Sequence, residues 1–219
     1  TMMPLVKADG KAELALLEQL TSRSVEVDRR VTVAVSAILD AVRSRGDDAL
    51  REYTRQFDGV DPVLEPVDRE QIRQMAASCH PDVYAALERA AANIADFHRR
   101  QLQQSWLDTR KDGTIVGQRI RGLARVGIYV PGGTAAYPSS VLMNAIPARI
   151  AGVEEIIMVT PPPKDGGFNF DVMAAAYIAG VDKIYLVGGA QAVAALAYGT
   201  DSIPRVDKIV GPGNIYVAT

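Results

Sequence analysis

Cysteine is almost absent from this sequence: Cys79 is the single cysteine among 219 residues. One thiol supports neither an internal disulfide nor a cysteine-rich zinc site, so the fold has to be stabilised by its core. A basic excess is also missing, because 24 lysines and arginines face 26 acidic residues. The resulting net charge of −2 gives little attraction to a phosphate backbone. We therefore expect no nucleic-acid partner.

Long apolar runs are lacking as well. No segment approaches the ~20 apolar residues that a helix needs to cross a bilayer, and no secretory signal pattern is present. We expect a cytoplasmic protein with no membrane partner. Hydrophobic residues make up 48% of the chain and charged residues 23%, which is typical of a folded globular protein.

The sequence has few side chains of the types that commonly act in catalysis or bind metals. The two histidines, His80 and His98, fall in segments with helical periodicity, and neither belongs to an H-E-x-x-H pattern. Cys79 follows a helical pattern beside alanines, so a buried structural thiol is the favoured interpretation. From the residues alone, we predict no metal ligand and no catalytic residue in this chain.

The composition changes near Leu123. Of 50 charged residues, 37 precede Ala124, whereas 12 of the 18 glycines follow it. This shift predicts two units. Residues 1–123 are expected to form a mainly helical region with a small hairpin, whose turn is Asp112-Gly113. Residues 124–219 are expected to form a Rossmann-like βα repeat.

The second half contains an internal repeat. The nine residues from Ala148 to Ile156 are echoed by a similar segment 28 positions later, from Ala176 to Ile184, and the last four residues of that segment return as Val-Asp-Lys-Ile from Val206. Each copy is typical of a helix that ends at glycine and is followed by a short apolar strand, as in successive βα units of a parallel sheet. We predict an α/β fold: a helical N-terminal region followed by an incomplete Rossmann-like parallel sheet with flanking helices. The predicted strands are Val126–Val130, Ile156–Val159, Ile184–Val187 and Ile209–Val210.

Three of these strands run into glycine-rich turns, which begin at Pro131, Gly188 and Gly211. Ligands of open parallel sheets bind beyond the carboxyl ends of the strands, so the turns predict a nucleotide or phosphate crevice. No turn matches G-x-G-x-x-G, and side chains must carry more of the recognition. Tyr129, Gln191 and Asn214 are the candidates. Each also has a structural alternative: a core position for Tyr129, and helix capping or turn stabilisation for the two amides.

The segment RVGIYVPGGTAAYPSSVLMNAIPARI, which starts at Arg125, resembles histidinol dehydrogenase. The resemblance continues through VGGAQAVAALAYGT from Val187 and VDKIVGPGNIYV from Val206. It implies a cytoplasmic, zinc-dependent homodimer that oxidises L-histidinol through L-histidinal to L-histidine, with two NAD⁺ used in succession. It also implies that Tyr129, Gln191 and Asn214 bind NAD.

Family members are much longer than this chain. The resemblance implies that the zinc ligands and the Glu-His acid–base pair follow the GPGN motif that ends at Asn214. The chain is therefore expected to be an N-terminal fragment whose Rossmann-like unit is truncated. On this expectation it carries part of the NAD site, no zinc ligand and no catalytic residue, and is inactive alone.

Two other functions remain open at this point. One is a paralogue of the same family that oxidises another small polar alcohol. The other is a non-catalytic nucleotide-binding module. Substrate-contacting residues would separate the first from histidinol dehydrogenase, and turnover would exclude the second.

Overall fold

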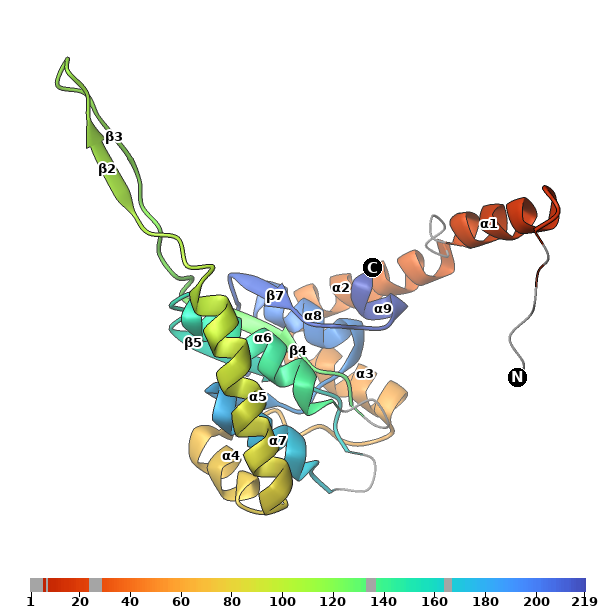
Figure 1. The fold of residues 1–219 in the computed structure, drawn as a ribbon. Coiled ribbons are helices and arrows are strands. Elements are labelled where there is room, and N and C mark those ends of the chain that lie inside the picture. The colour runs from red at the N-terminus through yellow and green to blue at the C-terminus, as the bar shows by residue number, and fades with distance from the viewer. Residues whose placement is uncertain (1–5, 7, 24–28, 133–136, 164–166) are drawn as a thin grey trace.

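The computed structural model describes residues 6, 8–23, 29–132, 137–163 and 167–219. A five-stranded sheet forms its centre, with helices on both faces, and two arms leave this body: helix α1 and the hairpin β2–β3 (Figure 1). The strands are β1 (Val67–Asp68), β2 (Trp106–Thr109), β3 (Ile115–Gln118), β4 (Arg125–Tyr129), β5 (Glu155–Val159), β6 (Lys183–Tyr185) and β7 (Lys208–Val210). The helices are α1 (Ala12–Arg23), α2 (Arg29–Arg45), α3 (Asp47–Asp58), α4 (Arg69–Ala76), α5 (Pro81–Arg99), α6 (Pro138–Ile150), α7 (Phe170–Ala179), α8 (Gly189–Tyr198) and α9 (Ile215–Ala218).

The strand order of the sheet is β1-β6-β5-β4-β7. Strand β4 pairs in parallel with both β5 and β7, and β5 pairs in parallel with β6. The chain therefore steps from β4 to β5 and β6 in one direction and then crosses back to place β7 on the other side of β4. This is the reversal that defines the ligand crevice of Rossmann-like sheets. The predicted α/β class and its parallel strands are confirmed.

The sequence repeat corresponds to two helices, α6 and α7, that end in the same way. Gly152 and Gly180 follow α6 and α7 with φ of 81° and 80°, a left-handed conformation that glycine adopts without strain. The next residue in each copy bonds back into its helix: the Val153 amide donates to the Ala148 carbonyl (3.1 Å) and the Val181 amide to the Ala176 carbonyl (2.9 Å). The same local motif thus ends each helix and starts the following strand.

The two Val-Asp-Lys-Ile segments make the same pair of hydrogen bonds at the amino edge of the sheet. Asp182 accepts a hydrogen bond from the Ile156 amide (2.7 Å), and Asp207 accepts one from the Arg125 amide (2.9 Å). In both cases the aspartate amide donates to the carbonyl of the same partner residue. Each aspartate therefore joins the start of its own strand to a neighbouring one.

Alternate residues of β5 belong to two hydrophobic clusters. Ile157 and Val159 lie in a cluster with residues of α2, α3 and α8, whereas Ile156 and Met158 lie in one with residues of α4 to α7. Side chains of a strand alternate between faces, so the clusters cover opposite faces of the sheet. Helices of the first half thus join α6, α7 and α8 in burying the sheet of the second half. Strand β1 adds an antiparallel edge strand to β6. The division into folding units at residue 123 stays a prediction.

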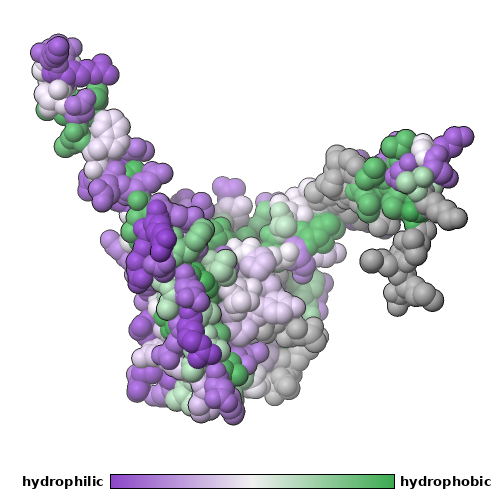
Figure 2. Space-filling model, viewed as in Figure 1, coloured by the Kyte–Doolittle hydropathy of each residue, from purple (hydrophilic) through white to green (hydrophobic). Residues whose placement is uncertain are grey.

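The predicted hairpin is present. Strand β2 pairs with β3, and Gly113 takes a φ of 84° in the turn. The arm projects well away from the body (Figures 1 and 2). Its Trp106 and Leu107 side chains are exposed. No helix in the described part of the chain has the length and apolar character needed to span a bilayer.

Candidate functional site

Three turns meet at the carboxyl edge of the sheet. They follow β4, β6 and β7, and close contacts between them show how tightly they assemble. A Cβ on Gly188 would lie 2.5 Å from Cγ of Pro161, which follows β5, and a Cβ on Gly211 would lie 2.2 Å from the Tyr129 carbonyl oxygen. Gly211 also has a φ of 139°. Glycine is therefore required where these strands leave the sheet. Residues 133–136, part of the first predicted turn, lie outside the described residues.

Tyr129 ends β4 and is 5% exposed. Its hydroxyl oxygen accepts a hydrogen bond from the Gly189 amide (3.1 Å), the first residue of α8. Burial raises the pKa of this phenol above its ordinary value, so the hydroxyl stays protonated at neutral pH. Tyr129 is thus a core residue whose polar end fixes the start of α8 against β4.

Gln191 lies in the first turn of α8 and is only 1% exposed. Neither its Oε1 nor its Nε2 has a hydrogen-bond partner among the described residues. A buried amide without partners costs about 1–3 kcal/mol, and such groups in folded proteins call for an explanation. A ligand that bonds both amide atoms at the helix N-terminus would supply one.

Asn214 follows β7 and caps α9. Its Oδ1 accepts hydrogen bonds from the Tyr216 amide (3.0 Å) and the Val217 amide (3.2 Å). The capping alternative is therefore realised in the structure. Because both bonds use the carbonyl oxygen, the exposed amide nitrogen is the group left to donate to a ligand.

The structure brings Tyr129 and the α8 turn of Gln191 together by the Tyr129–Gly189 bond. Tyr129 also lies beside the residue that leads to Asn214, since Gly211 approaches its backbone. The sequence analysis did not select Pro161 as a residue of this site, although it packs against Gly188. Its position shortly after the predicted strand Ile156–Val159 could have indicated it.

The histidines and the cysteine have structural roles. His80 caps α5, where its Nδ1 accepts a bond from the Asp82 amide (3.3 Å), and His98 contacts Gln101 (2.7 Å). Cys79 is buried, and burial followed by its hydrogen bond to Asp171 raises its pKa. Among the described residues, no three histidine, cysteine, aspartate or glutamate side chains gather into a possible metal site. The described residues therefore do not fit a zinc ion.

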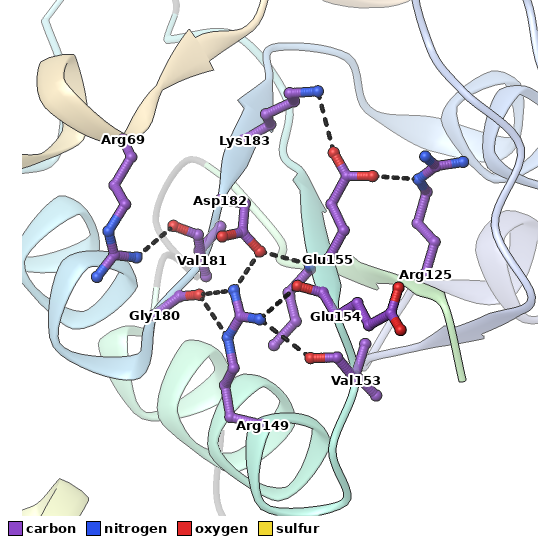
Figure 3. Close-up of polar contacts among 11 residues, drawn as sticks. Arg69, Arg125, Arg149, Val153, Glu154, Glu155, Gly180, Val181, Asp182 and Lys183 are labelled. Carbon is purple, nitrogen blue, oxygen red and sulfur yellow. Dashed lines mark hydrogen bonds and ion pairs between the residues drawn. The ribbon is translucent and has the colours of Figure 1, made fainter. Parts of the chain in front are cut away.

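A second polar cluster lies at the opposite, amino edge of the sheet (Figure 3). Arg149 donates to the carbonyls of Gly180 (2.9 and 2.5 Å), Val153 (3.0 Å) and Glu154 (2.8 Å), and to the Asp182 carboxylate. A hollow of about 610 Å³ beside it is lined mainly by alanine and isoleucine side chains of α5 to α7. All five guanidinium donors of Arg149 are used, so this cluster stabilises the fold.

Beside it, Glu155 joins Arg125 to Lys183. Burial acts to raise the pKa of Glu155, but the hydrogen bonds from Arg125 and Lys183 hold it below its ordinary value. The carboxylate therefore stays ionised at neutral pH and links the first residues of three adjacent strands.

Comparison with known proteins points to one family. The family model described as histidinol dehydrogenase matches residues 21–219. The chain is 53% identical to histidinol dehydrogenase of Syntrophotalea carbinolica, over all of this chain and 51% of the relative. It is 54% identical to that of Listeria monocytogenes, over 92% of this chain and 46% of the relative.

A solved structure agrees with this result. The crystal structure of histidinol dehydrogenase from Elizabethkingia anophelis superposes with a TM-score of 0.80 at 34% identity, over 88% of this chain and 45% of that one. The chain thus spans about half the length of the relatives that it matches.

Proposed function

Since this chain belongs to the histidinol dehydrogenase family, we propose that it supplies the dinucleotide-binding side of an enzyme that oxidises L-histidinol through L-histidinal to L-histidine. NAD⁺ is the proposed oxidant, used twice. The family resemblance further leads us to propose a cytoplasmic, zinc-dependent homodimer. No step is assigned to zinc here, because the described residues do not fit that ion.

The orphaned amide of Gln191 is the observation that carries the cofactor assignment. It lies at the N-terminus of a ten-residue helix, at the carboxyl edge of a sheet whose strand order reverses at β4. Free N–H groups and the positive end of the helix dipole favour the negative charge of a dinucleotide pyrophosphate. The residues present therefore fit NAD, whose nicotinamide ring accepts a hydride when bound.

Each candidate residue has a separate task in this proposal. Gln191 would exchange hydrogen bonds with the cofactor through both amide atoms. Its 1% exposure means that cofactor binding has to uncover it. Asn214 would donate through Nδ2 while its Oδ1 continues to cap α9. Tyr129 would keep the start of α8 in place through Gly189.

Asn214→Ser tests the cofactor role without removing the cap, because serine is a comparably good N-cap residue. In a protein of the relatives' length, supplied with zinc, we expect L-histidinol-dependent NADH formation. The Asn214→Ser variant should keep its melting temperature and raise the KM for NAD⁺ about tenfold, which corresponds to one hydrogen bond of ~1.4 kcal/mol.

Two results would contradict the proposal in different ways. NADH formation with another polar alcohol but not with L-histidinol would assign the protein to a paralogue. An unchanged KM for NAD⁺ in Asn214→Ser would return Asn214 to a capping role alone.

A further inference from the structure

The carboxyl end of helix α3 reaches the cofactor edge of the sheet. At its other end, Asp47 accepts hydrogen bonds from Ser202 through the hydroxyl (2.6 Å) and the amide (3.5 Å), and Ser202 lies just beyond the last turn of α8. Helices α3 and α8 pack against each other. Because the start of α3 is hydrogen-bonded to a residue just beyond the end of α8, the two helices run in opposite directions. Asp58, the last residue of α3, therefore lies toward the start of α8.

The helix lengths agree with this placement. Twelve residues of α3 rise about 18 Å and ten residues of α8 about 15 Å, so the two helices are nearly matched in length. Along α3, Leu50 belongs to the hydrophobic cluster that contains Tyr129 and Ala190, and Tyr53 packs against it. Burial is the main cause of the raised pKa of Tyr129, and the negative charge of Asp58 adds to it. The carboxylate thus lies within electrostatic reach of the phenol that holds Gly189.

The start of α8 lies on the adenosine side of a Rossmann-like crevice. Gly188 packs against Pro161 at the end of β5, and Gly189 bonds Tyr129 at the end of β4. Both contacts are on the side of β4 away from β7. In Rossmann-like dehydrogenases an acidic residue accepts a hydrogen bond from the adenosine ribose 2′-hydroxyl. Strand β5 ends at Val159, and neither Val159 nor the described residues 160–163 that follow it carry a carboxylate.

Among the described residues, this arrangement places the acidic group of Asp58 toward the start of α8, whose buried Gln191 amide lacks a partner. We propose that the partly buried Asp58 carboxylate recognises the adenosine ribose of the dinucleotide and makes the enzyme select NAD over NADP. The inference rests on the proposed function, because it assumes a dinucleotide at this edge. It adds a specificity residue, on an element outside the parallel strands, to the three residues already considered.

The surroundings of Asp58 favour a hydroxyl over a phosphate. The carbonyl end of a helix carries partial negative charge, and α3 ends at Asp58 with Gly59 in a left-handed conformation (φ 74°). Arg55, one turn earlier, is paired with Asp61 (2.9 Å), so its charge is already matched. The 2′-phosphate of NADP would thus meet a carboxylate and a helix C-terminus. The neighbouring Phe57 ring is 52% exposed and stacks on Tyr53, leaving a surface on which adenine could stack.

Asp58→Asn in the protein of full family length tests the inference, with NAD⁺ and NADP⁺ compared in both turnover and calorimetric binding. We expect the preference for NAD⁺ over NADP⁺ to fall by about tenfold or more, because removing the charge relieves repulsion of the 2′-phosphate. The KM for L-histidinol should not change. Asp48→Asn is the matched control: it makes the same charge change at the exposed start of α3, away from the proposed ribose site, and should leave the preference intact.

The outcomes separate this inference from the proposed function. If Asp58→Asn and a second variant, Asp58→Ser, both keep the wild-type cofactor preference, Asp58 does not select the cofactor. The proposed function still stands in that case if the wild-type protein oxidises L-histidinol. If the wild-type protein binds NAD⁺ without oxidising L-histidinol, the proposed reaction is wrong. The ratio of the NAD⁺ and NADP⁺ affinities, compared between wild type and Asp58→Asn, still tests the role of Asp58. Wild-type protein that binds neither dinucleotide overturns both.

Discussion

Gln191→Met is expected to make the protein more stable and to weaken NAD⁺ binding at the same time. The amide of Gln191 is buried and unpartnered, so the folded state pays its desolvation without a compensating bond. Methionine has a similar shape and no strong polar group. We expect the free energy of unfolding to rise by about 1–2 kcal/mol and the melting temperature by roughly 4 °C. The affinity for NAD⁺ should fall about tenfold to a hundredfold, since both amide bonds to the cofactor are lost.

Thr54→Val provides the matched control. Thr54 is fully buried in α3, and its Oγ1 also lacks a partner among the described residues. Its replacement should stabilise the fold by a similar amount while leaving NAD⁺ affinity unchanged. Thermal unfolding and calorimetric titration measure the two effects. A Gln191→Met protein that is less stable and binds NAD⁺ normally would show that the amide has a structural partner and no cofactor role.

Arg149→Ala is expected to be the most destabilising single change at the amino edge of the sheet. The guanidinium joins the endings of α6 and α7 by bonds to the carbonyls of Val153, Glu154 and Gly180 and to Asp182 (Figure 3). Truncation leaves these acceptors without their charged donor. We expect a loss of about 3 kcal/mol in the free energy of unfolding, which lowers the melting temperature by roughly 6–12 °C.

Arg99→Ala is the control for that loss. Arg99 is exposed on α5 and lines the same hollow, so its removal should change stability by less than about 0.5 kcal/mol. Urea unfolding of both variants compares the two effects directly. If Arg149→Ala unfolds at the same urea concentration as Arg99→Ala, Arg149 does not join the two helix endings in solution.

The strands and the repeat could be predicted because each uses a local signal. Apolar runs that end in glycine turns located β4 to β7 to within two residues at each end, and the recurring glycine at 152 and 180 has the same left-handed conformation. Strand β1 could not be predicted, because it consists of Val67 and Asp68 alone. Its pairing with β6 is created by helices that hold it at the sheet edge, and two residues carry no periodicity.

The meeting of the glycine-rich turns at one edge of the sheet could be predicted from the sequence, whereas their use as a cofactor site stays a prediction. Glycine-rich turns after parallel strands indicate the crevice, but they do not show that Gln191 is buried without partners or that Tyr129 bonds Gly189. Those facts depend on how α8 packs across the sheet. The end of α3 at Asp58 had no sequence signal linking it to the crevice, because its place depends on the Asp47–Ser202 contact between distant segments.

A crystal structure of a protein of the relatives' length with NAD⁺ bound tests the proposed cofactor site most directly. We predict that the dinucleotide lies at the carboxyl edge of the sheet, with the Gln191 amide uncovered and bonded to it, Asn214 Nδ2 donating to it, and the adenosine ribose at Asp58. A dinucleotide bound elsewhere, with Gln191 still buried and unpartnered, would contradict it.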